Sequence, residues 1–197
     1  DARIKVYHTE NKGIGGSRRF GVDQVHGDYL IFTDADDWAE PDYISALYEA
    51  IVSQNAQMAI CAYIEEYGHN SKIANIEPHV NINDYTKDLL RGRTWAVVWN
   101  KLVKTSIVRD NHITFDKNIR YWEDVAFSVS YSLYCDKVAY VTKALYHYVK
   151  NNSQSLTATE GVNIEYNKEK VKNIRIVEHH LERKGKQAIF DMDLLWI

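Results

Sequence analysis

Three carboxylates occur within four positions, at Asp34, Asp36 and Asp37, directly after an apolar run at residues 29–32. Such a run is typical of a strand, and the carboxyl end of a strand in an open α/β sheet borders the crevice where ligands bind. Carboxylates this close repel one another, and a divalent cation bound through hard oxygen ligands removes that repulsion. By itself the pattern fits a metal site and a solvated acidic loop before a helix near Pro41 equally well.

A glycine-rich stretch at residues 11–21 precedes these carboxylates and contains Arg18 and Arg19. Backbone N–H groups beside guanidinium groups suit a phosphate or a nucleotide. The stretch follows a strand-like segment at residues 4–7, and it is neither a P-loop nor a full dinucleotide fingerprint. Because glycines also occur in ordinary strand-to-helix turns, this stretch alone does not identify a ligand.

Two adjacent acids, Glu123 and Asp124, lie at the predicted start of a later helix. Carboxylates there complement the positive end of the helix dipole, so their position alone does not assign them to catalysis. His147 lies in a predicted strand, where a histidine is more often packed and hydrogen-bonded than bound to a metal.

The elements that must position these residues alternate between strand and helix, as an α/β sheet requires. The apolar stripe of the last helix is best explained by packing on the domain, with a dimer seam as the alternative. We predict helices over residues 41–54, 84–91, 123–134 and 163–183, strands over residues 58–63, 95–103 and 138–148, and a loop over residues 67–78.

The composition of the 197 residues excludes several classes of protein. Twenty-seven acidic residues against 24 basic ones give a net charge of −3, and the basic residues are spread along the chain, so nothing indicates a nucleic-acid partner. No apolar run reaches the roughly 18 residues of a membrane span. Cys61 and Cys135 are interpreted as buried free thiols in a reducing compartment. We expect a location in the cytoplasm, either free or at the inner face of the membrane.

Together these segments resemble, in their order and spacing, the family-2 glycosyltransferases of the GT-A fold. The resemblance covers residues from about 3 to about 157. It rests on Asn11, Gly13, Arg18, Gly21, Gly27-Asp28-Tyr29, Asp34-Ala35-Asp36-Asp37-Trp38, Pro41-Asp42-Tyr43, Trp99-Asn100-Lys101-Leu102, Phe115, Trp122-Glu123-Asp124, Tyr148 and Ser153.

This resemblance implies an α/β protein with a Rossmann-like mixed sheet flanked by helices. Residues 1–157 would form the GT-A catalytic domain, and residues 158–197 would form a C-terminal helical segment. Members of the family begin with a nucleotide-binding strand, turn and helix that do not precede Asp1, so we expect an N-terminally incomplete piece of a longer protein.

On the donor side, the resemblance implies that Asp34 and Asp36 form a DxD element. Asp36 would hold Mn²⁺ or Mg²⁺ against the diphosphate of a nucleotide-sugar donor, and Asp34 would lie near the ribose or a metal-bound water. Arg18 would be a nucleotide contact.

On the acceptor side, Asp124 resembles the general base of an inverting transfer, and Trp122 and Glu123 resemble acceptor-binding residues. Some GT-A enzymes add a late histidine to the metal site, and His147 is compatible with that role. The acceptor would be a hydroxyl of a glycan or of a lipid-linked acceptor, as in bacterial surface polysaccharide synthesis. A homo-oligomer is compatible with the sequence.

Two other functions fit the same residues. A nucleotidyltransferase-like enzyme would also bind a nucleotide sugar and a divalent metal, but it would need a basic glycine-rich loop near its N-terminus. A non-catalytic carbohydrate-binding module could retain the fold and lose the chemistry. Sugar transfer or donor hydrolysis separates these alternatives.

Overall fold

A mixed sheet of six strands runs through the part of the chain that the computed structural model describes, residues 1–150 and 164–190. Its hydrogen-bonded order is β1-β5-β3-β6-β2, and β4 pairs with β3 beside this path. Strands β3 and β6 are parallel, and every other pair is antiparallel. The strands are β1 (Tyr29–Leu30), β2 (Trp38–Ala39), β3 (Met58–Glu66), β4 (Ser71–Ala74), β5 (Lys101–Lys104) and β6 (Val138–Val149).

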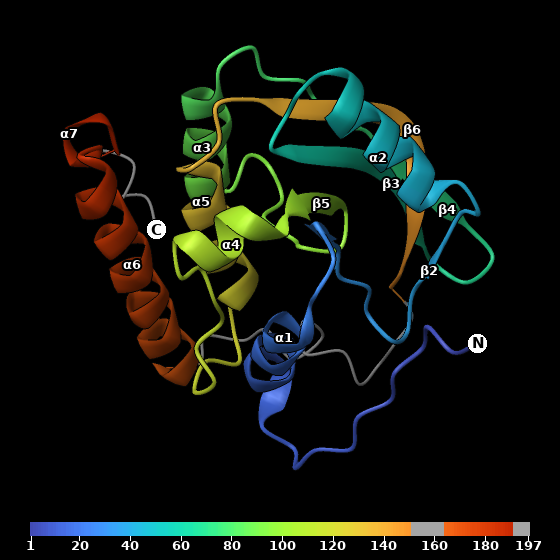
Figure 1. Ribbon diagram of the computed structural model, residues 1–197, viewed down its shortest axis with the longest axis horizontal. Coiled ribbons are helices and arrows are strands. Elements are labelled where there is room, and N and C mark those ends of the chain that lie inside the picture. The colour runs from blue at the N-terminus through green and yellow to red at the C-terminus, as the bar shows by residue number, and fades with distance from the viewer. Residues whose placement is uncertain (151–163, 191–197) are drawn as a thin grey trace.

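Helices cover both faces of this sheet (Figure 1). The alternation of side chains along a strand divides β3 between two apolar cores, because Met58 and Ile60 pack on one face while Ala59 and Cys61 pack on the other. Helix α2 covers the second face, and α3 and α5 cover the first, with α6 packed on α5. The helices are α1 (Gly13–Gln24), α2 (Tyr43–Ser53), α3 (Ile82–Leu90), α4 (Thr105–Asp110), α5 (Glu123–Ser132), α6 (Ile164–Lys184) and α7 (Gln187–Phe190).

The last long helix, α6, packs on α5, as the apolar stripe predicted (Figure 1). Val177 and Leu181 lie in the same core as the residues of α5. The helix ends at Lys184, where Gly185 has a φ of 60°, a conformation that glycine adopts without strain. Within the described residues, none of the helices is long and apolar enough to span a membrane.

Three predicted elements differ from the structure. Residues 4–7 form no strand: Ile4 and Val6 are 71% and 74% exposed, and no strand within the described residues pairs with them. The predicted loop at 67–78 contains β4, because a turn at Gly68 folds the chain back onto β3. The predicted strand at 95–103 is β-structured only from Lys101, and the preceding residues form an irregular segment that lines a cleft.

Both cysteines are buried and free, as expected. Ser153, one of the residues that carry the resemblance, lies outside the described residues, as does the start of the C-terminal segment at residues 158–163.

Candidate active site

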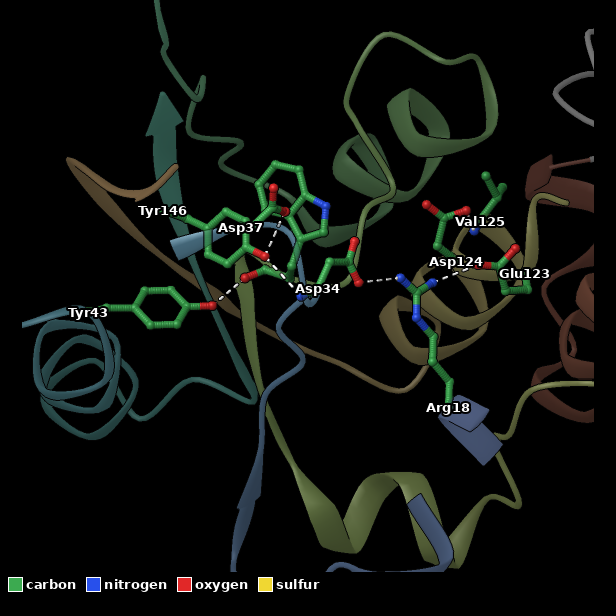
Figure 2. Close-up of polar contacts among 9 residues, drawn as sticks. Arg18, Asp34, Asp37, Tyr43, Glu123, Asp124, Val125 and Tyr146 are labelled. Carbon is green, nitrogen blue, oxygen red and sulfur yellow. Dashed lines mark hydrogen bonds and ion pairs between the residues drawn. The ribbon is translucent and has the colours of Figure 1, made fainter. Parts of the chain in front are cut away.

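A tight turn at Asp34–Asp37 carries the three predicted carboxylates, and the side chain of Asp37 fastens it to strand β6. The N–H of Asp37 donates to the carbonyl oxygen of Asp34 at 3.3 Å. The Oδ1 of Asp37 accepts from the N–H of Val149 at 2.9 Å, and its Oδ2 accepts from the hydroxyl of Tyr146 at 2.8 Å (Figure 2). That hydroxyl also accepts from the N–H of Asp34 at 3.0 Å. With the turn held by Asp37, the side chains of Asp34 and Asp36 line the cleft.

The tyrosine that holds this turn is itself fixed by aromatic packing. The ring of Tyr146 stacks on Trp99, with ring centroids 4.5 Å apart. The buried Tyr43 of α2 donates a hydrogen bond to the carbonyl oxygen of Trp99. The position of the acidic turn therefore depends on three buried aromatic side chains from separate parts of the chain.

Arg18 of α1 connects this turn to the start of α5 (Figure 2). Its Nη2 donates to Oδ1 of Asp34 at 3.0 Å, and its Nη1 donates to Oε1 of Glu123 at 2.6 Å. Gly15 allows this approach, because a Cβ there would lie 2.5 Å from the carbonyl oxygen of Ile119. Helix α1 thus docks by its backbone against the segment that leads into α5.

The start of α5 has an unusual backbone conformation. Trp122, the residue before the helix, has a φ of 68°, which costs a bulky side chain about 1–3 kcal/mol. Glu123 is buried, and the Oδ1 of Asp124 accepts from the N–H of Val125 at 2.8 Å. Burial, with the neighbouring Asp124 adding to it, raises the pKa of Glu123 to about 7. Burial also raises the pKa of Asp124, whereas Arg18 opposes that rise.

Helix α6 supports the strained residue. The side-chain amide of Asn173 donates to the carbonyl oxygen of Tyr121 at 2.9 Å. The ammonium group of Lys170 lies 4.3 Å from a ring centroid of Trp122, within the range of a cation–π contact. The C-terminal helix is therefore part of what positions the predicted acceptor side.

One cleft of about 1070 Å³ contains both acidic groups. This volume slightly exceeds the usual upper limit of about 1,000 Å³ for small-molecule sites. The residues to which the sequence analysis assigned roles line it together, namely Arg18, Asp34, Asp36, Trp122, Glu123 and Asp124. Their roles stay predictions, but their convergence from α1, the turn after β1 and the start of α5 is a finding of the structure.

The family model described as glycosyl transferase family 2 matches residues 1–119. This chain belongs to that family. EpsH of Bacillus subtilis (strain 168), which is named as a glycosyltransferase, is 31% identical over 155 residues that cover 75% of this chain and 45% of EpsH. The glycosyltransferase GlyA of Streptococcus pneumoniae serotype 4 is 30% identical over 173 residues, covering 81% of this chain and 24% of GlyA. The chain therefore spans less than half of each of these relatives.

The fold is that of a GT-A glycosyltransferase, as predicted. The crystal structure of Staphylococcus aureus TarS 1–349 in complex with UDP matches with a TM-score of 0.72, at 17% identity, over 95% of this chain and 51% of TarS 1–349. TarS 1–349 has also been solved with UDP-GlcNAc, and that structure matches with a TM-score of 0.67 over 90% of this chain, at 16% identity.

In this chain, His147 is not among the residues that line the cleft with Asp34 and Asp36. Its Nδ1 is 2.7 Å from an oxygen of Glu66, and its Nε2 is 3.1 Å from an oxygen of Glu40. Both ring nitrogens therefore have carboxylate partners. The structure supports the packed, hydrogen-bonded interpretation of this histidine.

The sequence analysis missed the structural role of Lys101. This buried ammonium donates to the carbonyl oxygens of Trp95 at 3.1 Å and Val97 at 2.5 Å, and to Oδ1 of Asn100 at 2.8 Å. Burial lowers its pKa to about 7, although the charge of Asp124 opposes that shift. Lys101 holds the segment that forms one wall of the cleft, and the polar Asn100-Lys101 pair inside an apolar run was the signal that could have revealed it.

Proposed function

We propose that this protein is an inverting, divalent-metal-dependent glycosyltransferase that uses a nucleoside-diphosphate sugar as its donor. One observation carries the proposal: a single cleft holds an acidic turn open to solvent and, across Arg18, a partly buried carboxyl with a raised pKa. The first group suits a cation and a diphosphate, and the second suits a proton acceptor. TarS, which has the same fold, has been solved with UDP and with UDP-GlcNAc.

The donor set fits a hard cation. Within the described residues, no cluster of three or more histidine, cysteine or acidic side chains forms a complete metal site. The two carboxylates of Asp34 and Asp36 are nevertheless oxygen ligands in the cleft, and Mg²⁺ or Mn²⁺ is commonly held by one or two carboxylates together with substrate phosphates. Such a cation would neutralise charge that develops on the departing nucleoside diphosphate.

The remaining chemistry is assigned to residues of this chain. Asp124 accepts the proton of the acceptor hydroxyl as that oxygen attacks the anomeric carbon from the face opposite the diphosphate. Trp122 and Glu123, which line the cleft beside it, position the acceptor. We propose a hydroxyl of a glycan or a lipid-linked glycan as that acceptor. Synthesis of a bacterial surface polysaccharide, on the cytoplasmic side of the membrane, is the corresponding process.

The test is a transfer assay on the full-length protein with a panel of UDP, GDP and dTDP sugars, with Mn²⁺, with Mg²⁺ or with EDTA. We expect one donor to be hydrolysed slowly and transferred to glycan acceptors, with inversion at the anomeric carbon seen by NMR. EDTA should stop both reactions. Formation of a nucleotide sugar from a sugar phosphate and a nucleoside triphosphate would indicate a nucleotidyltransferase instead. Glycan binding without hydrolysis or transfer would indicate a binding module.

A further inference from the structure

Arg18 holds the two acidic groups of the cleft together by one hydrogen bond to each (Figure 2). Its side chain is only 11% exposed. We propose that Arg18 is a positioning residue: it acts as the counter-ion of Asp34 until a divalent cation takes that place, and it then pairs with Glu123 alone. This inference rests on the proposed function, and it gives Arg18 a role other than contact with the nucleotide.

The surroundings of Arg18 keep its guanidinium between the two carboxylates. Gly15, one helical turn earlier, brings the backbone of α1 against the carbonyl oxygens of Asp116 and Ile119. The guanidinium carbon lies 5.9 Å from the ring centroid of Phe115, which is a cation–π distance. A side chain fixed at its base and along its length can shift its hydrogen bonds between two neighbours without leaving the cleft.

The acidic turn does not depend on Arg18 for its shape. Asp37 is bonded to the hydroxyl of Tyr146 and to the N–H of Val149, and that hydroxyl also accepts from the N–H of Asp34. Removing the guanidinium should therefore remove a positive charge from beside Asp34 while the turn keeps its backbone conformation.

This arrangement sets a competition. A guanidinium 3.0 Å from the carboxylate of Asp34 repels any cation that approaches the same oxygen. When a cation binds, the pair between Arg18 and Asp34 weakens, and the guanidinium is left to Glu123. Glu123 directly precedes Asp124 at the start of α5. Binding of a cation at Asp34 therefore changes the ion pair of the residue next to the proposed proton acceptor.

The test measures Mn²⁺ binding by electron paramagnetic resonance, without nucleotide, in the full-length wild-type protein and in Arg18→Met, Arg18→Lys and Arg19→Met. Arg19 is the matched control, because it is an exposed arginine on the same helix. Arg18→Met should bind Mn²⁺ about tenfold more tightly, since one opposing charge has gone. The same variant should transfer sugar at least about tenfold more slowly. In both assays Arg18→Lys should give values between those of wild type and Arg18→Met. Arg19→Met should stay within about twofold of wild type in both assays.

Unchanged or weaker Mn²⁺ binding by Arg18→Met would overturn the inference, and a loss confined to nucleotide affinity would identify Arg18 as a nucleotide contact. Wild-type protein that binds no Mn²⁺ would instead count against the proposed metal dependence. In that case hydrogen exchange tests the arrangement by itself: Arg18→Met, but not Arg19→Met, should lose amide protection at 123–125, while 34–37 should keep it because Asp37 still holds that turn. Unchanged protection at 123–125, or lost protection at 34–37, would refute the inference.

Discussion

The acidic turn after β1 and the acidic start of α5 present the same functional group to one cleft in opposite surroundings. Asp36 is exposed on a turn whose neighbouring residue, Asp37, accepts hydrogen bonds from Tyr146 and Val149. Glu123 is 7% exposed, and burial raises the pKa values of both Glu123 and Asp124. A carboxylate that keeps its water can exchange that water for a cation, whereas a buried carboxyl with a raised pKa can accept a proton near neutral pH. The surroundings of each carboxyl group, more than its residue type, decide whether it suits cation binding or proton transfer.

The largest expected effect tests the acidic start of α5. Asp124→Asn keeps the shape of the side chain and removes the proton acceptor, so turnover should fall by roughly 10²–10⁴ while donor affinity stays within a few-fold. Glu123→Gln should reduce turnover less and should raise the KM for the acceptor. Steady-state kinetics with varied donor and acceptor measure both. If Glu123→Gln is the inactive variant and Asp124→Asn keeps near wild-type turnover, the base has been assigned to the wrong neighbour.

A smaller effect tests the docking that joins the two groups. Gly15→Ala should lower the free energy of unfolding by about 1–3 kcal/mol, because its Cβ would meet the carbonyl oxygens of Asp116 and Ile119 at 2.6 and 2.5 Å. Gly21→Ala is the control in the same helix. A Cβ there meets nothing within 4 Å, so this change should stabilise by about 0.5–1 kcal/mol. Urea denaturation measures both, and equal effects would show that α1 does not dock closely at Gly15.

The smallest effect is a shift in pH dependence. A base with a raised pKa stays protonated to higher pH, so kcat/KM should rise with pH through a range above that of an ordinary aspartate. Arg18 and Lys101 oppose the rise in the pKa of Asp124. Arg18→Met removes a charge that lowers the pKa of Asp124, so the acidic limb of this variant should move to higher pH. A limb that stays in place would show that the guanidinium does not influence the base.

The parts of the site that local sequence encodes were predictable. The run before Asp34, the cluster of acids after it and the apolar stretches of β3 and β6 each carry their own signal within a few residues. Strand β4 gave no such signal, because its side chains are mostly exposed and its residues lack apolar alternation. It forms because the turn at Gly68 returns the chain to the edge of β3.

Long-range contacts of the site could not be predicted in this way. Arg18 and Glu123 are 105 positions apart, and their pairing depends on how α1 docks. The left-handed conformation of Trp122 also cannot be predicted from the neighbouring sequence, because a tryptophan disfavours it and contacts from α6 help to hold it. These features follow from tertiary packing, which one sequence does not display.

The most direct test of the division between the two acidic groups is calorimetry of nucleoside diphosphate binding to the full-length protein with Mn²⁺ and with EDTA. A panel of UDP, GDP and dTDP identifies the nucleotide. The account predicts that Asp36→Ala weakens Mn²⁺-dependent binding by about 100-fold or more, because the cation loses a carboxylate ligand. Asp124→Asn and the exposed-surface control Asp23→Ala should bind like wild type. Retained Mn²⁺-dependent affinity in Asp36→Ala, or its loss in Asp124→Asn, would contradict the account.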